Sequence, residues 1–292
     1  MTLSPRPRLA LAALLFSTGG AAIKATSLNG WQVAGWRSGI AALVILLLVP
    51  GARRHWGWRP FVVGLASGAT FLLFVVANKL TTAANTIFLQ SAAPLYMVLL
   101  SPLLLKEKPR RQDLVLMAIV ATGLALFFVG SDSAVATAPD PARGNVLAAL
   151  SGVGWAFTVM GLRWMTAREG DHAVVAVVIG NLLAFVVGVW QGGPLTNVSA
   201  SDVGVLFYLG IFQIAAAYLL ITSGLRHVPA LEAAVILLIE PAFSPFWAWL
   251  VHHEQPSAWA LAGGLLIITA TTVQSILAAR SAGGRPVVEV IE

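Results

Sequence analysis

The sequence predicts an all-α polytopic membrane protein with ten transmembrane helices, arranged as two inverted five-helix repeats. Three observations lead to this fold class. Hydrophobic residues make up 58% of the 292-residue chain and charged residues only 10%, whereas about a quarter of the residues of a soluble domain are charged. The apolar residues lie in blocks of about twenty, long enough to cross a bilayer as helices. Two of these blocks contain a proline near the midpoint, at matching places in the two halves.

Ten apolar segments meet the length requirement, and proline or glycine marks several of their boundaries. Predicted transmembrane helices cover residues 9–25, 31–50, 60–80, 83–105, 112–130, 145–165, 173–191, 203–222, 231–251 and 257–278. None of them has the features of a cleaved signal peptide. The chain contains no cysteine, so disulfides and thiolate metal sites are excluded.

The basic residues predict the orientation. If the N-terminus is cytoplasmic, 14 of the 18 lysines and arginines fall in cytoplasmic segments, as the positive-inside rule requires. We therefore expect a multi-pass protein of the cell inner membrane with both termini in the cytoplasm. The net charge of +6 then reflects topology and contact with anionic membrane lipids, and the scattered basic residues do not indicate nucleic-acid binding.

The two mid-span prolines, Pro94 and Pro241, lie 147 residues apart, and the same shift carries Ala83 onto Ala230. A proline inside a helix removes a backbone hydrogen bond and clashes with the preceding turn, so each span should bend or break there. Broken spans at matching places in two halves indicate the binding site of a transporter built from repeats. We therefore predict that Pro94 and Pro241 act as hinges.

A polar stretch at residues 131–144 divides the chain. It predicts a first five-helix repeat at 1–130, an extracytoplasmic linker at 131–144, and a second repeat at 145–292 that ends in a short cytoplasmic tail. Because five is odd, the second repeat must enter the membrane upside down relative to the first. Such inverted pairs support alternating access of a central site to the two sides of the membrane.

These features resemble the EamA type of the drug/metabolite transporter superfamily. The resemblance rests on the two five-span halves, on a proline-containing fourth span that ends in Lys106-Glu107, and on a ninth span that reads Glu240-Pro241 and ends near Glu254. Within the superfamily, the chain looks most like amino-acid exporters of the YddG type, which handle aromatic and other neutral amino acids. The resemblance implies ten helices around a central cavity, lined mainly by spans 1, 3, 4, 6, 8 and 9.

Two charged residues lie well inside predicted spans. Glu240 is at the centre of the ninth span, where an ionised carboxylate costs about 2.5–3.5 kcal/mol unless it faces protein or water. It is expected to bind a substrate ammonium group or exchange a proton, or else to accept hydrogen bonds freed at Pro241. Arg37 lies in the second span, outside the implied lining, and is expected to snorkel outward or to pair with a buried carboxylate.

Polar and aromatic residues of the implied lining are candidate substrate contacts. Amides inside a bilayer need partners, which favours Gln90 and Gln213 as substrate ligands, with packing between helices as the alternative. Trp155 and Tyr96 are predicted to wall the cavity against an apolar substrate side chain, unless they serve helix packing alone.

Three polar residues lie at the outer ends of spans. Asn78 and Lys79 end the third span, where Lys79 is expected either to receive a substrate carboxylate or to reach the lipid headgroups. Lys24, at the outer end of the first span, is expected to be an interfacial anchor.

Other chemistries lack support in the sequence. His252-His253-Glu254 resembles a metal cluster but lies in a short loop without a further ligand nearby, and a histidine precedes Glu254 where relatives usually have a small residue. No Walker loop is present, so ATP does not power the protein directly. No nucleophile and base share one depth in the membrane. We therefore expect neither an enzyme nor a cofactor.

The sequence as a whole predicts a secondary, ATP-independent transporter that exports neutral and aromatic amino acids by alternating access. The alternative within the same class is an exporter of lipophilic cations or other small metabolites. The expected partners are the amino-acid substrate and membrane lipids, without nucleic acid, and the inverted pair can enclose its cavity as a monomer.

Overall fold

The computed structural model describes residues 4–54, 56–104, 111–129, 134–166, 172–225, 227–228 and 230–283. Within these ranges the regular elements are helices, apart from one isolated bridge between Val135 and Ala138. This confirms the prediction of an all-helical membrane-type protein.

The first half contains single long helices and helices that follow one another in series. Its elements are α1 (Pro5–Ser17), α2 (Gly19–Lys24), α3 (Gly30–Leu48), the short 3-10 helix η1 (Pro50–Arg53), α4 (Trp58–Leu80), α5 (Ala83–Gln90), α6 (Ala93–Leu104) and α7 (Arg111–Val129).

The second half repeats this mixture of continuous and interrupted helices. Its elements are α8 (Pro141–Thr166), α9 (His172–Gly192), α10 (Ala200–Phe207), the π-helix η2 (Tyr208–Ala216), α11 (Ala217–Leu225), α12 (Ala230–Leu237), α13 (Ile239–His252) and α14 (Ala258–Gly283).

Each predicted span coincides, within a few residues, with one helix or with helices in series. Six described stretches are long and apolar enough to cross a membrane, namely Gly30–Leu48, Trp58–Leu80, Ala83–Leu100, Pro141–Leu162, Ala173–Gly192 and Ala200–Ile221. That all ten segments cross the membrane, and that the two halves are inverted, stays a prediction.

Both proline-containing spans are interrupted at equivalent places. Helix α5 ends at Gln90 and α12 ends at Leu237, each four residues before the proline of its span. In an unbroken helix the carbonyls of Gln90 and Leu237 would accept from the N–H groups at positions 94 and 241, which proline lacks. The second half-helix then begins with proline in its first turn, where a fixed φ is favourable. The hinge function of Pro94 and Pro241 stays a prediction.

Two further interruptions occur without proline. The first span breaks at Thr18, between α1 and α2. Ser17 and Thr18 donate through their hydroxyls to the carbonyls of Leu14 and Leu15, both at 2.7 Å, and such bonds bend helices. The eighth span widens into the π-helix η2 at its middle, a feature that is rare and frequent at functional sites.

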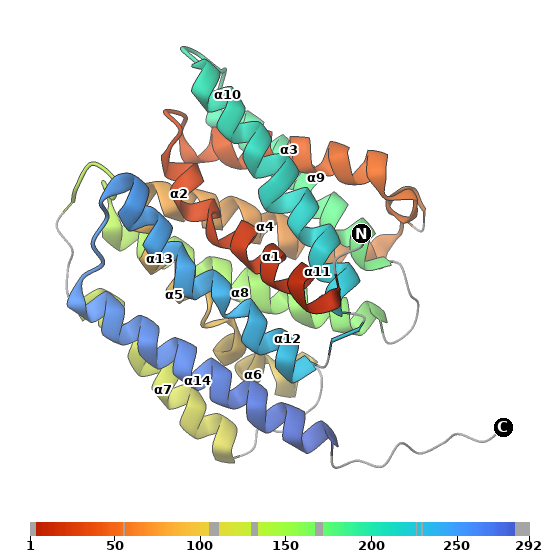
Figure 1. The fold of residues 1–292 in the computed structure, drawn as a ribbon, viewed down its shortest axis with the longest axis vertical. Coiled ribbons are helices and arrows are strands. Elements are labelled where there is room, and N and C mark those ends of the chain that lie inside the picture. Colours follow the sequence, from red (N-terminus) through yellow and green to blue (C-terminus); the bar gives the residue numbers. More distant parts are fainter. Residues whose placement is uncertain are drawn as a thin grey trace.

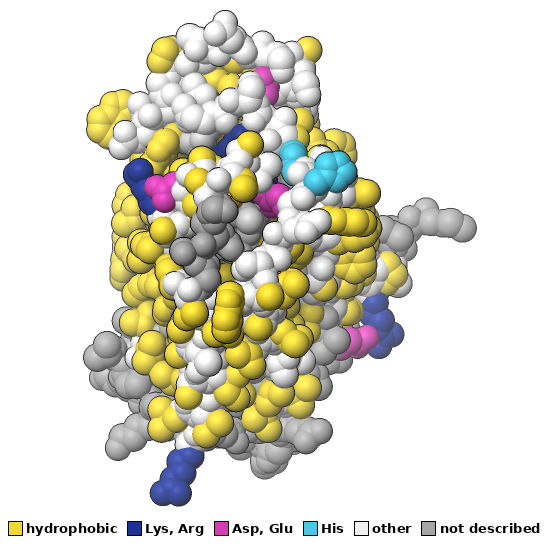
Figure 2. All heavy atoms as spheres, turned by 90° about the vertical axis from the view of Figure 1, so that its left-hand side faces the viewer, with side chains coloured by type: hydrophobic (Ala, Val, Ile, Leu, Met, Phe, Trp, Pro, Cys, Tyr) yellow, Lys and Arg dark blue, Asp and Glu magenta, His cyan; other side chains and the backbone are white. Residues whose placement is uncertain are grey.

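Figure 1 shows how the interrupted helices lie in the bundle. Helix α1 crosses the middle and packs between α11 and α13, while α7 and α14 lie side by side along one edge. Helices α3, α4, α8 and α9 form closely packed neighbours on the other side. In Figure 2, hydrophobic side chains are spread over the middle and lower parts of the face, as expected for a surface that meets lipid.

The α3–α9 contact depends on two glycines that bring the backbones together. A Cβ on Gly188 would lie 2.6 Å from the Cα of Gly35 and 2.7 Å from the carbonyl oxygen of Trp31.

We expect Gly188→Ala to lower the free energy of unfolding by about 1–3 kcal/mol through overpacking, measured by thermal or denaturant unfolding in detergent. Gly204→Ala is the control, because a Cβ there meets no atom within 4 Å; equal stability of the two variants would contradict the prediction.

Candidate functional site

The break in the first span lies where the π-helix and α13 approach it. The Ser17 hydroxyl accepts a hydrogen bond of 2.9 Å from the indole N–H of Trp247 on α13. The hydroxyls of Thr18 and Tyr208, the first residue of η2, lie 2.7 Å apart in a hydrogen bond. Side chains from two other spans therefore hold the backbone break of the first span. We call residues Ser17–Gly20 the central break.

The two glycines of the central break allow polar side chains to touch its backbone. A Cβ on Gly19 would lie 2.7 Å from Nε2 of Gln213. A Cβ on Gly20 would lie 3.2 Å from Oδ1 of Asn78 and 3.4 Å from Oγ of Ser244. Asn78 is fully buried, and its Oδ1 has no hydrogen-bond partner among the described residues. Two predicted site residues, Gln213 and Asn78, therefore contact the same backbone break.

Arg37 corrects one expectation from the sequence. It does not snorkel outward: it is 2% exposed, and its Nη1 donates to Oε1 of Gln213 at 3.3 Å. Neither ion pair found in the described part of the chain includes Arg37. The depth of its position predicted a charge inside the span, but only the packing of α3 against η2 turns that charge inward.

Glu240 lies in the first turn of α13, directly after the interruption at Leu238, and its side chain is partly accessible. The charge of Glu240 acts electrostatically on Tyr218 of α11, and so does the charge of Arg37. The rings of Phe16 and Phe71 pack edge-on against Tyr218, with ring centroids 5.5 and 6.5 Å away. A carboxylate and a guanidinium thus both act electrostatically on the tyrosine of this aromatic cluster.

A separate group forms where α5, α6 and α8 meet. Gln90, the last residue of α5, donates through Nε2 to the hydroxyl of Ser151 on α8 at 3.3 Å. The ring of Tyr96 on α6 lies against Gly152, where a Cβ would be 3.2 Å from Cε2. Trp155 follows Ser151 by one helical turn and so shares its face of α8. The structure therefore brings together three of the predicted contacts on one side of the bundle.

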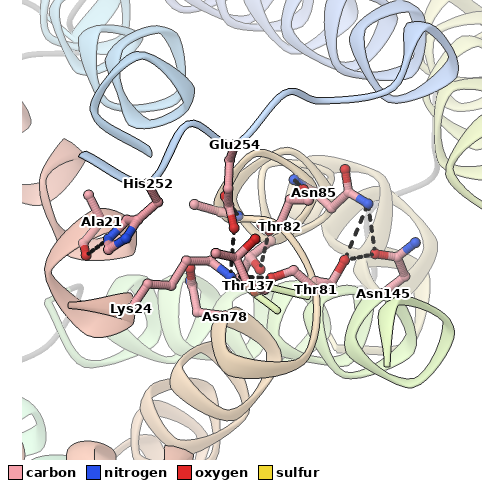
Figure 3. A network of polar contacts seen from close by, with 12 residues as sticks. Ala21, Lys24, Asn78, Thr81, Thr82, Asn85, Thr137, Asn145, His252 and Glu254 are labelled. Atoms are coloured by element: carbon pink, nitrogen blue, oxygen red, sulfur yellow. Dashed lines mark hydrogen bonds and ion pairs between the residues drawn. The ribbon is translucent and has the colours of Figure 1, made fainter. Parts of the chain in front are cut away.

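The end of the bundle that the sequence predicts to be extracytoplasmic, here called the outer end, is held by a buried ion pair. Lys24 Nζ lies 2.9 Å from Oε1 of Glu254, and each side chain is only 3% exposed. Lys24 also donates to the carbonyls of Thr81, at 2.7 Å, and Thr137. Glu254 accepts from the backbone N–H of Ala83 at 3.0 Å. Figure 3 shows these residues converging.

Amide side chains extend the ion pair sideways. Thr81 and Asn85 both donate to Oδ1 of Asn145, at 2.8 and 3.1 Å, and Asn145 donates in turn to the carbonyl of Phe127 at 3.0 Å. We call Lys24, Thr81, Asn85, Asn145 and Glu254 the outer network. Its members come from both predicted repeats, so it ties the two halves together at one end.

Lys24 is therefore not an interfacial anchor, because its ammonium group points into the protein to Glu254. Lys79 lies nearby and donates to the carbonyl and hydroxyl of Thr26, at 2.7 and 3.0 Å, and its role toward a substrate stays a prediction. His252 donates to the carbonyl of Ala21 at 2.8 Å. Glu254 and His252 thus have separate partners.

The opposite end carries a weaker contact between the halves. Arg6 and Glu232 form a two-pronged ion pair whose side chains are 69% and 36% exposed. They line a hollow of about 140 Å³ together with Ser4, Pro5, His227 and Val228. Exposed ion pairs contribute only about 0–1 kcal/mol. The ion pair at the opposite end is therefore the weaker of the two.

Sequence reasoning missed the outer network and the central break. Glu254 was visible as a loop acid and Lys24 as the basic end of the first span, but no spacing in the sequence joins residues 230 positions apart. Ser17-Thr18-Gly19-Gly20 was a signal for the break, because two hydroxyl residues before two glycines weaken a helix. The π-helix had no comparable signal.

The sequence profile of a family described as the EamA-like transporter family matches residues 9–129 and 142–276. The pseudopaline exporter of Pseudomonas aeruginosa is 26% identical over 270 residues, which cover 89% of this chain and 92% of that protein. An uncharacterized transporter of Bacillus subtilis is 25% identical over 228 residues, 74% of this chain and 75% of its own.

The fold has a counterpart among solved structures. A crystal structure superposes with a TM-score of 0.61 at 20% sequence identity and covers 95% of this chain and 98% of the other. This likeness shows a shared fold. The family match confirms the resemblance drawn from the sequence at the level of the family.

We expect loss of one partner of the buried ion pair to open the outer end. Glu254→Gln leaves the Lys24 charge buried and unpaired, which costs about 3–5 kcal/mol in the closed state. The readout is labelling of a cysteine at Ser244, which is 3% exposed in this cysteine-free chain, by an impermeant thiol reagent applied to the outer face of spheroplasts. Labelling should accelerate at least tenfold.

The matched control is Glu232→Gln at the opposite end, which should not accelerate labelling from outside. Replacing both Lys24 and Glu254 by methionine should return labelling toward the parent rate, because an apolar pair leaves no unpaired charge. Unchanged labelling in Glu254→Gln would show that the ion pair does not close this end.

Proposed function

The chain belongs to the EamA-like transporter family, and from this premise we propose that it is a secondary exporter of neutral amino acids, with a preference for aromatic side chains. A relative that covers most of the chain is named as an exporter, which supports the direction. The proposal places the protein in the cell inner membrane with both termini in the cytoplasm, as the distribution of basic residues predicts.

The observation that carries the proposal is the meeting of interrupted helices at the central break. The first span is broken at Thr18, the eighth widens around Gln213, and the ninth restarts at Ile239. Irregular backbone inside a membrane is tolerated where it is buried in protein or lines a cavity. In transporters built from repeats, broken helices near the midplane form the substrate site.

Alternating access then requires the two ends to open in turn. The outer network closes one end, and its members come from both repeats, so a movement of one repeat against the other must separate Lys24 from Glu254. The half-helices on either side of the interruptions before Pro94 and Pro241 would allow this movement, because neither span has a continuous hydrogen-bonded backbone there.

The proposed substrate contacts are Glu240, the two amides at the central break, and the separate group where α5, α6 and α8 meet. Glu240 supplies a negative charge for an ammonium group, while Asn78 and Gln213 supply amides. Tyr96 and Trp155 supply aromatic surface for the substrate side chain, with Gln90 beside them. A lipophilic cation is the second candidate, favoured by the partly accessible Glu240, for which no ion pair occurs among the described residues.

Proteoliposomes containing the purified protein should exchange labelled phenylalanine, methionine or threonine across the membrane in a saturable manner and without ATP. Empty liposomes are the control, and tetraphenylphosphonium tests the second candidate. Exchange of the cation without any amino acid would reverse the order of the two proposals.

Replacing both Pro94 and Pro241 by alanine restores two backbone donors and should stiffen the fourth and ninth spans. We expect the exchange rate to fall at least tenfold while the thermal midpoint in detergent is kept or raised, since alanine favours helix. Pro139→Ala, at an exposed position in the loop before α8, is the matched control. A full exchange rate in the double variant would remove the hinge from the mechanism.

A further inference from the structure

Arg37 is a buried cation for which the described contacts provide no opposite charge at hydrogen-bond distance. It is the eighth residue of α3, so it lies about 10 Å along the helix axis from Gly30 at 1.5 Å per residue. Its exposed fraction is 2%. An arginine so deep in a membrane bundle ordinarily pairs with an acid or marks a functional site.

The hydrogen bonds of Arg37 are incomplete. Its guanidinium carries five N–H donors, yet the bond found for it goes from Nη1 to the neutral amide oxygen of Gln213, at 3.3 Å. Its buried Nε has no partner among the described residues. An unsatisfied buried donor is costly. A bound ligand that accepts hydrogen bonds from the remaining N–H groups of Arg37 would remove this cost.

The surroundings indicate which ligand fits. A carboxylate matches the planar fork of arginine with two parallel hydrogen bonds. The charges of Arg37 and Glu240 both act electrostatically on Tyr218. The rings of Phe16 and Phe71 pack against the ring of Tyr218. A positive and a negative group therefore both act electrostatically on the tyrosine of one aromatic cluster.

We infer that Arg37 receives the carboxylate of the transported substrate and that Glu240 receives its ammonium group, beside the aromatic cluster of Phe16, Phe71 and Tyr218. This inference rests on the proposed function and narrows it to substrates that carry a carboxylate. Gln213 positions the guanidinium, and its contact with Gly19 links carboxylate binding to the central break.

Three ligands of similar shape distinguish the contributions of the carboxylate and the ammonium group to binding. Phenylalanine carries both groups, 3-phenylpropionate lacks the ammonium group, and phenethylamine lacks the carboxylate. Binding is measured by calorimetry or ligand-induced thermal stabilisation of the purified protein in detergent, for the parent, Arg37→Gln and Glu240→Gln.

Arg37→Gln should weaken phenylalanine and 3-phenylpropionate at least tenfold and leave phenethylamine unchanged. Glu240→Gln should weaken phenethylamine and leave 3-phenylpropionate unchanged. Arg37→Lys keeps the positive charge without the planar guanidinium, so its affinity for carboxylates should fall between those of the parent and of Arg37→Gln. If Arg37→Gln does not fold, Arg37→Lys takes its place in the comparison.

The outcomes distinguish this inference from the proposed function. Equal weakening of all three ligands in Arg37→Gln would make Arg37 a structural residue and overturn the inference, as would unchanged 3-phenylpropionate binding. If the parent binds 3-phenylpropionate through Arg37 but does not exchange amino acids, the inference stands and the amino-acid proposal fails. If the parent binds phenethylamine alone, the site takes cations and the inference falls.

Discussion

A helix that is interrupted inside a bilayer must find partners for its polar groups within the protein, because lipid offers none. In the predicted ten-span topology, this constraint applies to the central break. Ser17 and Thr18 bend the first span, and their hydroxyls are held by Trp247 and Tyr208 from two other spans. The break is therefore sustained by Tyr208 of the π-helix and by Trp247 of α13, which both belong to segments that are themselves interrupted.

The ion pairs at the two ends of the bundle differ in how far they are removed from water. Lys24 and Glu254 are both 3% exposed, so breaking the pair would leave a desolvated charge unless both groups reach water together. Arg6 and Glu232 are hydrated and separate at little cost. The ion pair at the outer end is thus the harder of the two to separate, while the two repeats also pack against each other along α3–α9, α4–α8, α4–α9 and α7–α14.

Much of the fold could be predicted from the sequence. Block lengths of apolar residues set the spans, and the missing N–H of proline set the interruptions, which fall four residues before Pro94 and before Pro241. The family could also be predicted, from the two five-span halves and the proline-containing fourth and ninth spans. The π-helix at Tyr208–Ala216 could not be predicted, since its extra residue per turn depends on packing against α3 and α1 and leaves no pattern in the sequence.

The candidate site shows the same division. By itself, the sequence determined which polar residues lie at depth, because charges and amides such as Glu240, Gln213 and Arg37 stand out in apolar segments. Only the tertiary structure decided where they point. It turned Arg37 toward Gln213 and Lys24 toward Glu254, because helix rotation is set by contacts between residues far apart in the chain, which the local order of residues does not specify.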